Sequence, residues 1–239
     1  MDETLTQTLV RFLIYLRRFV LETAISFLLL TLLFYFIAPD ILSVLQIHLS
    51  QHLAFFGVME PVVAMLKLSA LLSISILAPW IIYRLSRGLV EVTGLSRRFA
   101  LWFAIWALLL FYAGAAFCFF ITLPFGINFL LGYQSENLKA LISIGKFINF
   151  VTFFLLGFGL IFELPLLMIL LCKMGLCTPD LFATYRRYAI LIIAILAAIL
   201  TPTPDIFNMS LMGIPLYLLY ETGILFSRMF VRPSALAKN

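Results

Sequence analysis

Charged residues are few in this sequence. Lys, Arg, Asp and Glu make up 11% of its 239 residues, and 64% of the residues are hydrophobic. A soluble globular domain has about 25% charged and roughly 45–50% apolar residues, so this composition and a mean hydropathy of +1.14 exclude that class. They predict a polytopic membrane protein. The net charge of +5 is attributed to the excess of Lys and Arg that membrane proteins carry in their cytoplasmic loops, and no nucleic-acid partner is expected.

Cysteine and histidine are also scarce. The three cysteines, Cys118, Cys172 and Cys177, lack the spacing of metal ligands, and we expect them to serve packing. The two histidines, His48 and His52, could lie on one helix face as metal ligands, but no third ligand is nearby. The solvated face of an interfacial helix is the favoured interpretation, and no metal site is expected.

Signatures of enzymes are absent as well. Both histidines lie in one connecting segment, so no Ser–His pair within the apolar segments could serve as nucleophile and base. The sequence contains no HExxH string, no glycine-rich phosphate loop and no pair of carboxylates at a fixed helical spacing. These absences predict a protein without enzymatic chemistry.

Long apolar runs dominate what is present, and six are predicted to be transmembrane helices because a bilayer offers backbone groups no other partner. They cover approximately residues 19–38, 61–83, 99–121, 147–172, 188–201 and 206–226. No cleavable small-residue site precedes the first, which is therefore expected to be a retained anchor. No internal repeat or linker is found, so one domain comprising residues 1–239 is predicted.

The last two predicted helices are expected to be short. As a helix, residues 188–200 would span ~20 Å, whereas a hydrocarbon core is about 30 Å thick. Bilayer thinning or helix association would accommodate such a span, and a re-entrant hairpin is the alternative. Prolines within three of the six segments, Pro79, Pro165 and Pro215, predict kinks or broken hydrogen-bond ladders.

Positive charge is unevenly distributed over the connections. Of the 16 Lys and Arg residues, all but three lie in the N-terminal segment, the connections 84–98 and 173–187, or the tail. The exceptions are Lys139 and Lys146 in the opposite connections and Lys67 within the second apolar segment. Because cytoplasmic loops carry the excess of Lys and Arg, both termini are predicted to be cytoplasmic.

The two longest outer connections are predicted to differ. Residues 39–60 mix apolar and polar side chains, which favours a helix lying at the membrane interface. Residues 122–146 contain Pro124, Gly126 and Gly132 as helix breakers, and a loop is predicted there.

Glu163 lies near the centre of the apolar run 147–171, in the string FGLIFELP. An ionised, unpaired carboxylate at that depth would cost several kcal/mol. Two interpretations remain: a functional group facing a wet cavity, or a protonated glutamate hydrogen-bonded between helices. Glu22, Lys67 and Glu221 lie toward the ends of their segments, where reaching water is the favoured interpretation.

Four strings in the second half of the chain form a rare combination. They are LPFGINFLLG (123–132), FGLIFELP (158–165), RRYAILIIAILAAILTPTPD (186–205) and IPLYLLYETGILFSR (214–228), with weaker support from EPVVAMLKL (60–68) and APWIIY (78–83). Together they resemble the twin-arginine translocase subunit TatC. The resemblance implies six transmembrane helices shaped as a cup in a bacterial-type inner membrane. It also implies translocation of folded proteins that carry twin-arginine signal peptides, single-span partners of the TatA and TatB type, and no bound cofactor.

The sequence departs from this family where the signal's arginines are received. Tyr15 stands at the place of the family's N-terminal glutamate, and the connection 84–98 lacks the family's Phe and Pro, with Ser96 before the basic pair. The resemblance leaves as signal-binding candidates Glu91, Arg17, Arg97 and Arg98.

The resemblance also marks a contact for single-span partners. Thr201, Asp205 and Asn208 cluster where the two last helices meet, and Asp205 could also cap the last helix. Two rival functions remain: a proton-coupled transporter that uses Glu163, although no inverted repeat is visible, and a TatC paralogue with lost or altered signal binding.

Overall fold

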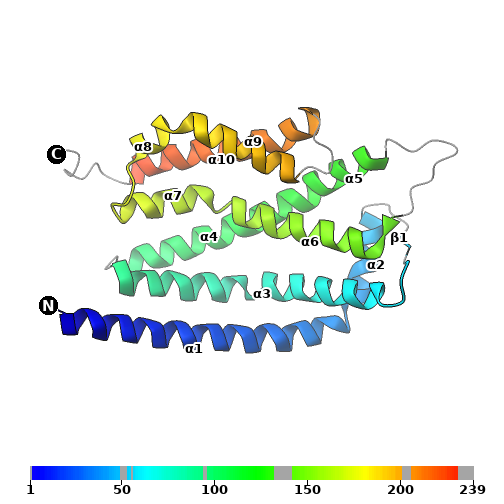
Figure 1. Ribbon diagram of the computed structural model, residues 1–239, viewed down its shortest axis with the longest axis horizontal. Helices are drawn as coiled ribbons and strands as arrows, with labels where there is room; N and C mark the ends of the chain where they lie inside the picture. The colour runs from blue at the N-terminus through cyan, green and yellow to red at the C-terminus, as the bar shows by residue number, and fades with distance from the viewer. Residues whose placement is uncertain are drawn as a thin grey trace. The chain divides into compact units, whose positions relative to one another are not determined.

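The structure, a computed structural model, describes residues 2–48, 53–54, 56–93, 96–131, 142–200 and 206–230. Almost all of these residues are helical (Figure 1), as predicted. The elements in chain order are α1 (Asp2–Tyr35), α2 (Ala38–His48), β1 (Leu53–Ala54), α3 (Glu60–Thr93), α4 (Arg97–Phe117), the π-helical η1 (Cys118–Thr122), α5 (Leu123–Leu131), β2 (Ile142–Ser143), α6 (Ile144–Ile161), α7 (Leu164–Lys173), α8 (Pro179–Thr184), α9 (Arg186–Leu200) and α10 (Ile206–Phe230).

Helical segments occupy all six predicted spans. By length and composition, four stretches of the described residues could cross a membrane: Arg17–Tyr35, Glu60–Gly88, Arg97–Ile127 and Ile144–Lys173. The fifth span, α9, has 15 residues and is short, as predicted. The sixth, α10, has 25 residues and is not short, so that part of the prediction is wrong, because the helix continues through Pro215 and past the predicted end at residue 226.

The predicted connection 84–98 is mostly helix rather than loop. α3 continues to Thr93, so Glu91, expected in a loop, lies in the last turns of this helix. Hydropathy marks where a helix leaves the apolar core but not where it ends. Between residues 84 and 93 Gly88 is the one helix-weakening residue, and a single glycine costs only about 1 kcal/mol in a helix.

The predicted loop 122–146 is also partly wrong, because the helix continues through η1 and α5 to Leu131. The N–H of Leu123 donates to the carbonyl of Cys118, five residues earlier. This wider π turn comes just before Pro124, which has no N–H to donate. The hydrogen bond that Pro124 cannot make therefore falls where the helix has already changed from four-residue to five-residue hydrogen-bond spacing. Of the predicted breakers, Gly132 lies outside the described residues. A helix is present in residues 39–60 as α2, and its location at the membrane interface stays a prediction.

Pro165 breaks its helix, whereas Pro79 and Pro215 lie within continuous helices. α6 ends at Ile161, and the Glu163 N–H donates to the Leu160 carbonyl at 3.1 Å in a tight turn. α7 then begins, with Pro165 in its first turn, where a missing N–H is tolerated.

The chain forms two compact units, each described by itself. Met1–Leu108 and Leu141–Phe153 form the first unit. Within it α1 packs along α3, and the Thr31 hydroxyl donates to Ser73 Oγ at 3.2 Å across this interface. β1 pairs in parallel with β2, which joins segments of the two outer connections.

The second unit comprises Leu109–Ala140 and Phe154–Asn239. Here α10 packs against both α7 and α9. α4 and α6 approach closely at Gly114, where an added Cβ would lie 2.6 Å from the Phe158 carbonyl oxygen. Small residues allow this kind of close backbone approach between membrane helices. The predictions of one domain and of a cup shape stay predictions.

Candidate functional site

Glu163 occupies the break between α6 and α7. The break follows from Pro165, so the sequence itself places this carboxyl group at an interruption of a membrane-spanning segment. Its side chain is half-buried, and the buried Oε1 has no hydrogen-bond partner among the described residues. A buried polar group without a partner is costly, so this oxygen marks Glu163 as a candidate functional group.

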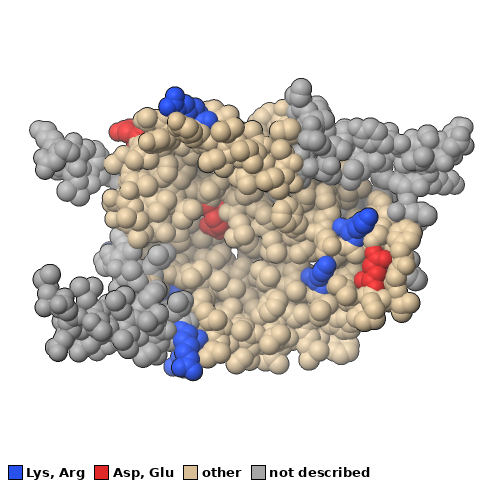
Figure 2. Space-filling view, viewed as in Figure 1, with Lys and Arg blue, Asp and Glu red and all other residues tan. Residues whose placement is uncertain are grey.

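Charged groups are otherwise sparse on the face drawn in Figure 2, where they form small separate patches on an uncharged surface. This fits a surface that mostly faces lipid, since large apolar side chains such as Leu28 and Leu160 are exposed. A polar group in an apolar environment of this kind, such as Glu163, is a candidate functional site.

A second polar cluster surrounds Glu22, at one end of the membrane-spanning part of α1. Glu22 Oε1 accepts from Arg18 Nε and Glu22 Oε2 from Arg84 Nη2, both at 2.8 Å. The Arg84 guanidinium also lies over the rings of Phe19 and Trp80, 5.8 and 5.4 Å from their centroids. Sequence reasoning had left Glu22 as a group reaching water. The i, i+4 spacing of Arg18 and Glu22 signals one half of this cluster, but no local pattern signals Arg84.

The four predicted signal-binding residues lie on three helices, α1, α3 and α4. Arg17 is exposed on α1, and Arg97 and Arg98 are exposed at the start of α4. The side chain of Glu91 lies outside the described part of the structure. Their function in signal binding stays a prediction.

An open apolar groove of about 480 Å³ lies between α9 and α10. Its lining includes Ile193, Ala197, Gly213, Ile214 and Leu218. Of the predicted partner-docking residues, Thr201 and Asp205 lie outside the described residues, and Asn208 lies in the first turn of α10 without a described side chain. The groove was not predicted, because it depends on how two helices from different segments pack.

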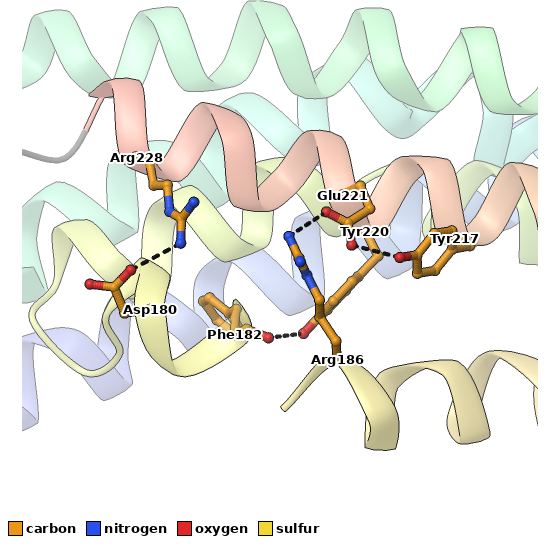
Figure 3. Close-up of polar contacts among 7 residues, drawn as sticks. All are labelled: Asp180, Phe182, Arg186, Tyr217, Tyr220, Glu221 and Arg228. Atoms are coloured by element: carbon orange, nitrogen blue, oxygen red, sulfur yellow. Dashed lines mark hydrogen bonds and ion pairs between the residues drawn. The ribbon is translucent and has the colours of Figure 1, made fainter. Parts of the chain in front are cut away.

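Polar contacts tie the α8–α9 segment to α10, as Figure 3 shows. Arg186 Nη2 lies 2.9 Å from Glu221 Oε2, and the Tyr217 hydroxyl donates to Glu221 Oε1 at 2.8 Å. Farther along, Arg228 pairs with Asp180 at 3.0 Å, and the Tyr220 hydroxyl donates to the Phe182 carbonyl. The carboxylate of Glu221 is therefore held by Arg186 and Tyr217, and Tyr217 also lines the apolar groove.

Comparison with known proteins identifies the family. Residues 11–215 match the family described as the Sec-independent protein translocase protein TatC. The chain belongs to the TatC family. A TatC of Halothiobacillus neapolitanus is 34% identical over 230 residues, which are 92% of this chain and 62% of that protein. A TatC of Carboxydothermus hydrogenoformans is 35% identical over 189 residues, 77% of this chain and 76% of that protein.

The fold agrees with a solved TatC. A crystal structure of the twin arginine translocase receptor TatC superposes with a TM-score of 0.80 at 29% identity, covering 91% of this chain and 99% of that one. The resemblance to TatC and the six-span fold class inferred from sequence are thus confirmed. The chain spans about 62% of the length of the Halothiobacillus protein.

Proposed function

We propose that this chain is the receptor and scaffold subunit of a twin-arginine protein translocase, which moves folded proteins across the membrane without catalytic turnover. The observation that carries the proposal is the family match over residues 11–215, reinforced by the structural similarity to a twin arginine translocase receptor. Its partners are TatA- and TatB-type single-span proteins and twin-arginine signal peptides, and no cofactor takes part.

Glu163 is the intramembrane polar site in this proposal. Its buried Oε1 has no hydrogen-bond partner among the described residues, and a partner helix or a passing signal segment that displaces the side chains covering it would donate a hydrogen bond to it. Interhelical hydrogen bonds in membranes are worth about 0.6–2 kcal/mol, enough to bias docking without holding the ligand permanently. The half-buried position allows access while limiting contact with lipid.

The groove between α9 and α10 is the docking surface for a single-span partner. Its exposed walls are apolar, which suits a helix already in the bilayer, where packing rather than water exclusion drives association. Thr201, Asp205 and Asn208 would add polar specificity near one end of α10. The shortness of α9 would thin the bilayer locally, which lowers the barrier to moving polar chains across it.

We infer that the protein lies in a bacterial-type cytoplasmic membrane, as its family membership suggests, and that both termini are in the cytoplasm, as the asymmetry of basic residues suggests. Cysteines introduced one at a time into a cysteine-free background test this topology. An impermeant reagent added from outside should label a cysteine near Asn137 and leave one near Ser96 unlabelled. The reverse pattern would refute the orientation.

Complementation tests the translocase function. A host that lacks its own TatC should export a folded reporter with a twin-arginine signal when this gene is supplied with matching single-span partners. A twin-lysine signal on the same reporter is the control and should leave it in the cytoplasm. Export that is equal with and without the gene would contradict the proposal.

A proton-coupled transporter is the second candidate, favoured by the unpartnered Glu163 oxygen alone. Purified protein in sealed vesicles would then take up a small solute along a pH gradient, and Glu163→Gln would abolish uptake. Uptake without any effect on reporter export would favour this candidate over the translocase.

A further inference from the structure

A polar pocket of about 380 Å³ lies between α3 and the start of α6 within the first unit, apart from the groups discussed above. Its lining includes Glu60, Lys67, Ser143, Lys146 and Asn149. Lys67 and Lys146 are two of the three basic residues that lie outside the predicted cytoplasmic segments. Two of these few lysines therefore line the same pocket.

The one acid of the pocket is already occupied by other donors. Glu60 accepts hydrogen bonds from the Ser143 hydroxyl, from the Gly145 N–H at 3.1 Å and from the Phe56 N–H at 2.8 Å. The carboxylate thereby caps the first turn of α6. Neither lysine forms an ion pair with a described residue.

The two lysines retain unused donors. Lys67 Nζ donates to Asn149 Oδ1 at 2.6 Å, and an ammonium group has three N–H donors, so two remain. The same contact leaves the Asn149 amide nitrogen as a further donor. Lys146 is exposed, and no hydrogen bond joins its ammonium group to a described residue. Two lysines and Glu60 give the pocket a formal charge of +1.

The depth of the pocket matches the edge of a bilayer. Lys67 is seven residues from the start of α3, and Lys146 and Asn149 are two and five residues from the start of α6. At 1.5 Å per residue these positions lie ~3–10 Å inside the helix ends. Lysines at this depth extend their ammonium groups toward the headgroup layer, where lipid phosphates lie.

We propose that this pocket binds the phosphate group of an anionic phospholipid, with Lys67 and Lys146 supplying charge and the Asn149 amide donating a hydrogen bond. Glu60 shapes the pocket by fixing β2 and the start of α6 but does not contact the phosphate. The lipid would sit at the α3–α6 junction and hold the two outer connections together from the membrane side. The site is independent of signal binding and transport.

Lipid binding to the purified full-length protein tests this site. Native mass spectrometry in an uncharged detergent would compare phosphatidylglycerol with phosphatidylcholine of the same acyl chains, and with inorganic phosphate. The unmodified protein should prefer phosphatidylglycerol. Loss of each lysine should weaken that binding about fivefold, as expected for one basic residue at an anionic headgroup.

Matched variants separate this site from general charge effects. Lys146→Gln removes no hydrogen bond or ion pair with a described residue, so this variant should fold normally and still lose affinity. Lys67→Gln combined with Lys146→Gln should abolish the preference. Lys173→Gln, on α7 outside the pocket, should bind as the unmodified protein does. Inorganic phosphate binding as tightly as the lipid would support the phosphate site but assign it to a free anion. Unchanged lipid preference in the double variant, or equal losses with Lys173→Gln, would overturn the proposal.

Discussion

Arg84 Nη2 on α3 lies 2.8 Å from Glu22 Oε2 on α1, although the two residues are 62 positions apart in the sequence. Arg84 is the less exposed partner, with 23% of its side chain accessible against 37% for Glu22. The rings of Phe19 and Trp80 shield the guanidinium. The pair therefore joins two long helices where solvent screening is reduced.

Replacing Glu22 by Gln should destabilise this helix pair. The substitution removes the charge that Arg18 and Arg84 share and leaves two like charges near each other, so we expect a loss of about 1 kcal/mol. Thermal unfolding of the purified protein in detergent measures the change. Arg18→Gln is the matched control, because Arg18 is 80% exposed and its pairing should contribute far less. Equal stability of Glu22→Gln and the unmodified protein would rule out a structural contribution from the pair.

Gly114→Ala should disturb the packing of α4 against α6. The new Cβ would lie 2.6 Å from the Phe158 carbonyl oxygen and 2.8 Å from Phe162 Cγ, so backbone or ring must move. Overpacking of this kind costs about 1–3 kcal/mol. Gly213→Ala in α10 is the control, because no described atom lies within 4 Å of its added Cβ and alanine favours a helix. A melting temperature lowered by both changes alike would contradict the packing explanation.

The fold could be predicted from sequence where hydropathy alone decides it. Six apolar runs predict six spans, and Pro165 predicts the break that places Glu163. The ends of α3 and α5 could not be predicted from hydropathy. A helix can continue beyond its apolar residues as long as its backbone hydrogen bonds continue. The π turn that accommodates Pro124 likewise depends on the whole helix and not on Leu123 and Pro124 alone.

Glu163→Ala should impair transport while the protein still accumulates in the membrane. The Oε1 of the carboxyl group makes no hydrogen bond with a described residue, so its loss removes no internal hydrogen bond through that oxygen. We expect at least about a tenfold loss of reporter export, equivalent to about 1.4 kcal/mol of lost interaction. Glu163→Gln should keep part of the activity by hydrogen bonding. If Glu163→Ala instead prevented stable insertion, the structural interpretation would be correct.

A photocrosslinker in the α9–α10 groove should capture a single-span partner. Ile214 lines the groove and is exposed, and Thr201 and Asn208 are the polar positions predicted beside it. Crosslinks from these three positions should appear in native membranes. Leu28 on α1, which is as exposed and as apolar, is the control. Crosslinks from Leu28 with none from the groove would move the partner site to α1.

The candidate site was only partly predictable, for reasons visible in particular residues. Glu163 is recognisable because a carboxylate in an apolar run is unusual. Glu22 is not, because its second partner comes from another helix. The pocket at Lys67 is also hidden in the sequence, since Asn149 lies 82 positions away.

Binding of a twin-arginine signal is expected to be weak. Arginine is distinguished from lysine by charge-assisted, bidentate pairing with carboxylates. Among the acids near the predicted cytoplasmic ends, Glu22, Asp180 and Glu221 already pair with arginines of the chain itself. Tyr15 replaces the glutamate that the family usually carries. Glu91 is left as the best acid for the signal.

Fluorescence anisotropy with labelled peptides tests this expectation on the purified protein. A twin-arginine peptide should bind less than about tenfold more tightly than a twin-lysine peptide, a difference below about 1.4 kcal/mol. Glu91→Gln should remove most of that difference, because Glu22, Asp180 and Glu221 pair with arginines of the chain itself. Arg84→Gln should increase twin-arginine binding, since it frees one oxygen of Glu22 for an incoming guanidinium. Tight, arginine-selective binding that survives Glu91→Gln would mean that the signal is received by groups other than Glu91.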